Sequence, residues 1–124
     1  MDDPADDVDI EALVVEALEA LPEVFRDRLG SVAIVVEDEP TSDQLAAVGA
    51  AGLFGLYQGV PRTVLGADQV AIPSKITLFR GPLMRASPTA AALAERVTET
   101  VHHEIAHHFG ISDARLRDLR RAHR

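Results

Sequence analysis

The chain has 124 residues, 47% of them hydrophobic, a formal net charge of −8 and no cysteine. This length suits one domain, so we expect a single domain over residues 1–124, and the lack of cysteine excludes disulfides and thiolate metal sites. The acidic balance argues against nucleic acid as a partner. The start, MDDPADDVDI, lacks the basic region and apolar stretch of a signal peptide, which favours a cytoplasmic protein.

Apolar residues at helical spacing predict a first helix over DVDIEALVVEALEALPEVF. Asp6 or Asp9 is its candidate N-cap, Pro22 interrupts it, and Gly30 is expected to end it. The β-branched run SVAIVVED then predicts a strand. A short capped helix is expected from about Ser42.

An uncharged run, QLAAVGAAGLFGLYQGVP, spans residues 44–61 and is about long enough to cross a membrane as a helix. Its four glycines and its proline argue against a membrane helix, so we expect no membrane as partner. A loop with a short strand near Phe54 to Tyr57 is expected instead. After it, SKITLFRG predicts another strand, closed by Gly81-Pro82.

Ser87 and Pro88 fit the N-cap and first position of a long helix that runs to Gly110. A last helix is expected from about Asp113 to Ala122. The chain end, DARLRDLRRAHR, holds five arginines against two aspartates, which favours a solvated helix face with internal ion pairs. The order of elements predicts an α+β fold, in which a short mixed sheet packs on the long helix and further helices flank it on the N- and C-terminal sides.

The most informative stretch is VHHEIAHHFGISD, residues 101–113, which holds four of the five histidines of the chain. On a helical wheel, His103 and His107 lie within about 40° of each other and about 6 Å apart along the axis, so both can reach one ion. Glu104 projects beside them. His108 falls within the apolar arc of the helix, where we expect it to be packed and hydrogen-bonded. His102 falls at the edge of that arc and is expected to be a rim residue.

His103, Glu104 and His107 form the pattern H-E-x-x-H, the helix signature of zinc peptidases. A straight helix carries Asp113 away from the histidines, but Gly110 can adopt the left-handed conformation, end the helix and return Asp113 to the same ion. Two imidazoles and one carboxylate leave a fourth zinc position open to water, as catalytic sites do. The alternative is a solvated helix end in which Asp113 is the N-cap of the last helix.

The stretch HEIAHHFGISD spells H-E-x-x-H-x-x-G-x-x-D and resembles the zincin metallopeptidases. Over about residues 30–115, the chain is similar to the short bacterial proteins described as minimal zincins, also through KITLFRGP and the loop GLYQGVP. The resemblance implies a small zincin-like domain with one Zn²⁺ per chain, bound by His103, His107 and Asp113. It also implies Glu104 as the general base of a peptidase, and a peptide or protein substrate paired along an edge strand near Ile76 to Arg80.

Hydrolysis also requires a group that stabilises the oxyanion, for which Tyr57, Arg80 and His123 are candidates. A zinc-stabilised interaction module with little turnover is the main alternative. The acidic N-terminal half and the lack of residues for the second subdomain of a large zincin favour it, whereas Glu104 opposes it because a structural site needs no base. A zinc-dependent ribonuclease is a third alternative, but such enzymes resemble H-G-x-x-H, and the acidic charge disfavours RNA.

Overall fold

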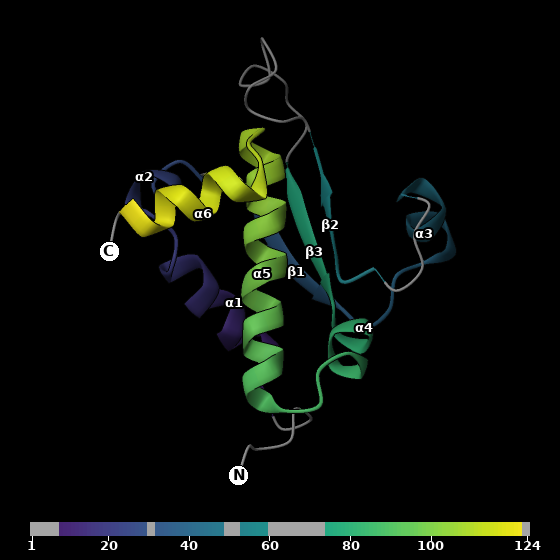
Figure 1. Cartoon of the computed structure of the whole chain (residues 1–124). Coiled ribbons are helices and arrows are strands. Elements are labelled where there is room, and N and C mark those ends of the chain that lie inside the picture. Colours follow the sequence, from purple (N-terminus) through teal and green to yellow (C-terminus); the bar gives the residue numbers. More distant parts are fainter. Residues whose placement is uncertain (1–7, 30–31, 49–52, 60–73, 123–124) are drawn as a thin grey trace.

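The computed structural model describes residues 8–29, 32–48, 53–59 and 74–122. Its elements are α1 (Ile10–Glu19), α2 (Glu23–Arg26), β1 (Ala33–Glu37), α3 (Ser42–Val48), β2 (Gly55–Gln58), β3 (Lys75–Phe79), α4 (Arg80–Arg85), α5 (Ala90–Phe109) and α6 (Asp113–Ala122). The long helix α5 lies across one face of the sheet, with α1 beside it and α6 crossing its C-terminal end (Figure 1). The predicted α+β fold is confirmed.

The three-stranded sheet is mixed and has the order β1-β3-β2. β1 runs parallel to β3 with Ala33 opposite Lys75, and β2 runs antiparallel to β3 with Gly55 opposite Leu78. The prediction of an edge strand near Ile76 to Arg80 is therefore wrong, because this segment holds the central strand. Its side chains Ile76, Thr77, Leu78 and Phe79 are fully buried, as a strand with neighbours on both sides requires.

The hydrophobic core lies where α5 packs against α1 and the sheet. Leu93, Val97 and Val101 of α5 are fully buried, in agreement with their helical spacing. Removal of these apolar surfaces from water is the main source of stability and fixes the orientation of α5 about its axis. The core cluster consists of Ile10, Val14, Ala17, Leu21, Ile76, Leu78, Leu83, Leu93, Val97, Val101, Ile105, Ala106 and Leu116.

The helix starts are set by side-chain caps. Asp9, one of the two predicted caps of α1, accepts a hydrogen bond from the Glu11 N–H at 3.0 Å. α5 begins later than predicted, because Thr89 is its N-cap and accepts from the Ala92 N–H at 3.1 Å. The predicted cap Ser87 instead accepts from the Nε–H of Arg96 at 3.2 Å. Gly30, predicted to end the first helix, lies outside the described residues.

Helix α4 was not predicted, because Gly81 and Pro82 are typical loop residues. Proline is nevertheless tolerated in the first turn of a helix, where its missing N–H would have no helical partner. Two contacts hold α4 against the segment that follows β1. The Gly81 N–H donates to the Asp38 carbonyl at 2.8 Å, and Arg85 makes a bidentate ion pair with Glu39 at 2.7 and 2.9 Å.

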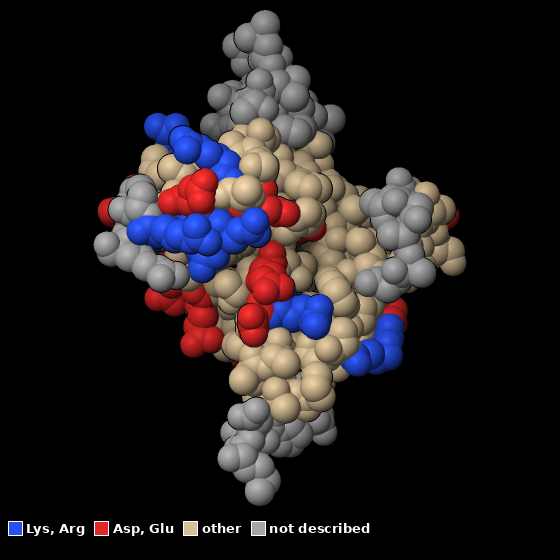
Figure 2. All heavy atoms as spheres, viewed as in Figure 1, with Lys and Arg blue, Asp and Glu red and all other residues tan. Residues whose placement is uncertain are grey.

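Basic side chains gather over α6 in the view of Figure 2. One of them, Arg121, makes the expected internal ion pair with Asp118 at 3.7 Å. In the uncharged run of residues 44–61, residues 44–48 belong to α3 and residues 55–58 form β2. Residues 53, 54 and 59 flank β2, and the rest of the run lies outside the described ranges. No helix within those ranges is long and apolar enough to cross a membrane.

Gly55 allows β2 to approach α5 closely. A Cβ at this position would lie 2.7 Å from Cγ2 of Thr100, well inside van der Waals contact. Thr100 cannot easily turn away, because its hydroxyl donates to the Arg96 carbonyl at 2.8 Å and its branched side chain has few rotamers. The distance between β2 and α5 therefore depends on the absence of a side chain at Gly55.

Gly55→Ala is expected to lower the free energy of unfolding by about 1–3 kcal/mol, because the new methyl group overpacks the contact with Thr100. Urea unfolding followed by circular dichroism measures the change. Thr100→Ser removes the clashing Cγ2 but keeps the hydroxyl, so it serves as a matched second variant. The double variant should be more stable than Gly55→Ala alone; a double variant as unstable as the sum of the two singles would contradict this explanation.

Candidate metal centre

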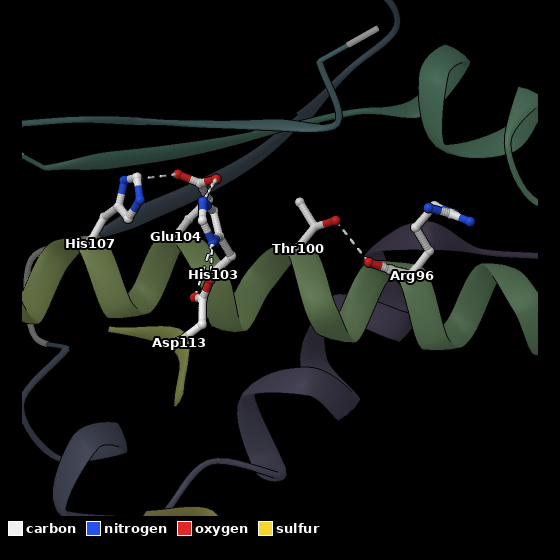
Figure 3. A network of polar contacts seen from close by, with 6 residues as sticks. All are labelled: Arg96, Thr100, His103, Glu104, His107 and Asp113. Carbon is white, nitrogen blue, oxygen red and sulfur yellow. Dashed lines mark hydrogen bonds and ion pairs between the residues drawn. The ribbon is translucent and has the colours of Figure 1, made fainter. Parts of the chain in front are cut away.

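His103 and His107 lie one turn apart on the exposed side of α5, with their ring centroids 4.5 Å apart. Their side chains are 46% and 52% exposed, whereas Glu104 beside them is only 7% exposed. The two imidazoles and the Glu104 carboxylate project from the same side of the helix (Figure 3). The structure thus brings together the three residues of the H-E-x-x-H pattern.

The Glu104 carboxylate lies between the two imidazoles. One oxygen is 3.9 Å from Nε2 of His103 and the other is 3.8 Å from Nδ1 of His107, distances longer than hydrogen bonds. The backbone N–H of Tyr57 in β2 donates a hydrogen bond to this carboxylate. Burial raises the pKa of Glu104 above its usual range, against the opposing effects of the two histidines and of the Tyr57 N–H.

A left-handed glycine ends α5, as predicted. Gly110 has φ 68° and ψ 31°, and its N–H donates to the His107 carbonyl at 3.1 Å. Ser112 is the N-cap of the next helix, because its hydroxyl accepts from the Arg115 N–H at 3.0 Å. The alternative that Asp113 is the cap is therefore wrong. Asp113 is the first residue of α6, and its carboxylate is free to face α5.

Asp113 returns to the histidine pair and contacts His103. The Nδ1–H of His103 donates to the Asp113 carboxylate, with distances of 2.8 and 3.0 Å to its two oxygens. With the proton on Nδ1, a neutral His103 carries its lone pair on Nε2, the nitrogen that faces Glu104. This carboxylate–imidazole contact is one that proteins use to orient metal-binding histidines.

The donors at this site fit zinc in type, since imidazole and carboxylate are both zinc ligands. They do not converge on one point as they stand. Asp113 lies against Nδ1 of His103, on the other side of the ring from Nε2, and no group of three His, Asp or Glu side chains in the described residues is placed to hold an ion. Three-donor binding requires a change in the side-chain angles of Asp113 or His103.

The two remaining histidines of the cluster are structural. His108 is 2% exposed and shares a hydrogen bond of 3.0 Å with the Tyr57 hydroxyl, which confirms its predicted role as a packed residue. His102 was expected at the rim but is only 5% exposed, and its Nε2–H donates to the Ala17 carbonyl at 2.8 Å. The end of α1 covers this edge of α5, a contact that the wheel of one helix cannot reveal.

The ionisation of His102 follows from its position. Burial lowers the pKa of its imidazole, an effect that the hydrogen bond to Ala17 opposes and the nearby charge of Arg120 reinforces. His102 is therefore neutral near pH 7 and acts as a polar anchor between α5 and α1.

The three candidates for an oxyanion group do not gather at the histidine pair. The Tyr57 hydroxyl is directed to His108 and Ser74. Arg80 lies on α4, where it pairs with Glu11 and Asp38 at 3.4 Å each. His123 lies outside the described residues. The contribution of Tyr57 to the site is instead its backbone N–H, which no sequence signal marks because it depends on the placement of β2.

A cavity of about 740 Å³ lies beside the histidine pair. It is bounded by the residues that lead into β2, by α5 and by α6. Sequence reasoning did not predict this cavity, because its walls come from three separate segments. Its lining residues are Leu53, Phe54, Gly55, Arg96, Glu99, Thr100, His102, His103, Glu104, Asp113, Leu116, Arg117 and Arg120.

Comparison with known families finds a match over most of the chain. The family model of zincin-like metallopeptidases matches residues 29–122, which include all the helices and strands from β1 to α6. A search of curated proteins finds none that matches the chain.

Proposed function

Because this chain belongs to the zincin-like metallopeptidase family, we propose that it is a zinc-dependent peptidase with Glu104 as its general base. In this proposal His103, His107 and Asp113 hold one zinc ion. The observation that carries the proposal is the position of Glu104, a buried carboxylate set between two half-exposed imidazoles. If this part of α5 were only a solvated helix end, a buried Glu104 carboxylate would not be expected, because burial of a charged group costs free energy.

Each residue of the site has a distinct task in peptide hydrolysis. Bound zinc would polarise the attacking water and the peptide carbonyl. Glu104 takes the proton of that water and delivers it to the leaving amine, and burial brings its pKa closer to the range in which a carboxylate does both. The Tyr57 N–H aims the Glu104 carboxylate, and Asp113 fixes the ring of His103. An anionic ligand also makes zinc a weaker activator of water, which increases the need for the base.

We place the substrate along the outer edge of β2 rather than near Ile76 to Arg80. The Phe54 carbonyl accepts from the Phe79 N–H at 2.9 Å, so the alternation of an antiparallel pair turns the backbone groups of Gly55 and Tyr57 away from β3. On that side the Tyr57 N–H already donates to Glu104, which leaves the Gly55 groups and the Tyr57 carbonyl for a peptide. Within the described sheet, that side of β2 has no neighbouring strand. An extended peptide can pair with such an edge.

Cleavage of unstructured peptide pools by the purified chain tests the proposal. Protein loaded with one equivalent of zinc is expected to cleave peptides, and removal of zinc by a chelator should abolish cleavage until zinc is restored. Peptide products are identified by mass spectrometry, and zinc is measured in every sample. Fully loaded protein that cleaves nothing across broad pools would refute the peptidase and favour a zinc-stabilised interaction module.

A further inference from the structure

The C-terminal helix α6 presents one face to the cavity beside the histidine pair. Asp113, Leu116, Arg117 and Arg120 all line the cavity. Their separations of three, four and seven residues place them on a single face of the helix. The face begins at Asp113, which contacts His103, so the two guanidinium groups continue from the candidate metal centre along one wall of the cavity.

Arg117 is the first arginine along this face of α6 after Asp113. It is exposed, and it makes no ion pair with any residue that the structure describes. Arg121, on another face of α6, pairs with Asp118. The sequence prediction of a solvated arginine face with internal ion pairs therefore holds for Arg121 but not for Arg117, which lines a cavity.

On the opposite wall of the cavity, the cationic side chain of Arg96 already contacts neighbouring side chains. The guanidinium of Arg96 lies 5.0 Å from the centre of the Phe54 ring, and its Nε–H donates to Ser87. Of the acidic residues around the cavity, Glu104 and Asp113 face the histidines, which leaves Glu99 as the only other acidic lining residue in the described part of the chain. The guanidinium group of Arg117 on the α6 wall can therefore bind an anion.

We infer that Arg117 recognises an acidic side chain, aspartate or glutamate, of the peptide substrate. Arginine suits this task because its planar donors match the two oxygens of a carboxylate. Along α6, Arg117 lies about 6 Å beyond Asp113, close enough to the candidate metal centre to meet a side chain of a peptide bound there. This inference rests on the proposed peptidase function.

A peptide fits these observations better than a nucleic acid. One arginine can bind one carboxylate, but a polyanion such as RNA would also contact the surrounding surface, and the chain carries 20 acidic residues against 12 basic ones. A single-stranded RNA is nevertheless included in the binding experiment as a competing ligand.

The first experiment measures binding without turnover. Zinc-loaded Glu104→Gln is titrated into fluorescent peptides that differ only by glutamate, glutamine or lysine at one position, and anisotropy gives each Kd. Glutamate is expected to tighten binding about tenfold at one position of the peptide, and less at high salt. Equal Kd values for the three peptides at all positions, or tighter binding of the RNA than of the glutamate peptide, would overturn the inference.

Charge reversal identifies the residue responsible. Arg117→Glu, made in the Glu104→Gln background, should reverse the order so that the lysine peptide binds tighter than the glutamate peptide. Arg115→Glu is the matched control, because Arg115 lies on the same helix and is exposed but does not line the cavity. It should keep the preference for glutamate. Loss of the preference in both variants, or in neither, would contradict a specific role of Arg117.

Cleavage by chains that retain Glu104 separates this inference from the proposed function. With the same peptides, Arg117→Glu should raise KM for the glutamate substrate about tenfold and leave kcat nearly unchanged. Cleavage with no preference for the acidic substrate would refute the recognition role and leave the peptidase intact. A preference in binding without any cleavage would refute the peptidase.

Discussion

Replacement of Glu104 by glutamine is expected to reduce peptide hydrolysis by about a hundredfold or more, without loss of zinc or of the fold. Glutamine has nearly the shape of glutamate and can still accept a hydrogen bond from the Tyr57 N–H through its amide oxygen. It cannot take a proton from water. The variant therefore removes the base and little else, and it does not leave a buried charge without its partners.

The measurement compares initial rates of peptide cleavage and zinc content in both proteins. Glu95→Gln is the matched control, because Glu95 lies on the same helix but is exposed and does not line the cavity. It should cleave like the wild type. Equal rates for the wild type and Glu104→Gln would remove Glu104 from the mechanism.

Replacement of His103 or His107 by alanine is expected to abolish stoichiometric zinc binding, since each change removes a nitrogen ligand from a site with few donors. Zinc content is measured by mass spectrometry of the purified protein, and affinity by competition with a chelating dye. His102→Gln and His108→Asn are the controls. Each keeps a side-chain amide near the position of the nitrogen that now contacts Ala17 or Tyr57, so both variants should bind zinc normally.

Asp113→Ala is the most informative member of this series. As a ligand, Asp113 should matter as much as either histidine. As a group that only orients His103 through Nδ1, its removal should lower zinc affinity about ten- to a hundredfold and leave one ion bound at saturation. We expect the larger loss, with the Asp113 side chain turning from Nδ1 of His103 to the metal. Normal zinc binding by Asp113→Ala, together with loss in either control, would show that the ligand assignment is wrong.

The parts of the fold that follow from local chemistry could be predicted from the sequence. Gly110 ends α5 in the left-handed conformation, and the apolar spacing of α5 puts its stripe in the core. The contact between Asp113 and His103 also follows from local geometry, because the turn that joins α5 to α6 has only three residues. Such features depend on residues within one or two helical turns of each other, so a glycine or a repeat of apolar residues is enough to predict them.

The features that were missed depend on contacts between distant segments. The sequence of β3 is that of a good strand, but nothing in it tells whether a second strand pairs on its far side. His102 lies at the edge of the apolar arc of α5, yet the end of α1 buries it. Arg117 belongs to an arginine-rich helix. The sequence of this helix predicts a solvated face and does not show that the face borders a cavity. The surroundings of each of these residues are decided by an element from elsewhere in the chain.

The hydrogen bond to the Glu104 carboxylate comes from a backbone N–H, and this affects how the chain can evolve. A side-chain donor can be lost by one nucleotide change, but every amino acid except proline supplies a backbone N–H at position 57. Substitution of the tyrosine side chain would alter the contact with His108, but the hydrogen bond from the N–H of residue 57 to the Glu104 carboxylate would remain. Descendants of this chain can therefore change the side chain at position 57 and keep this hydrogen bond, and only proline at this position or detachment of the strand would remove it.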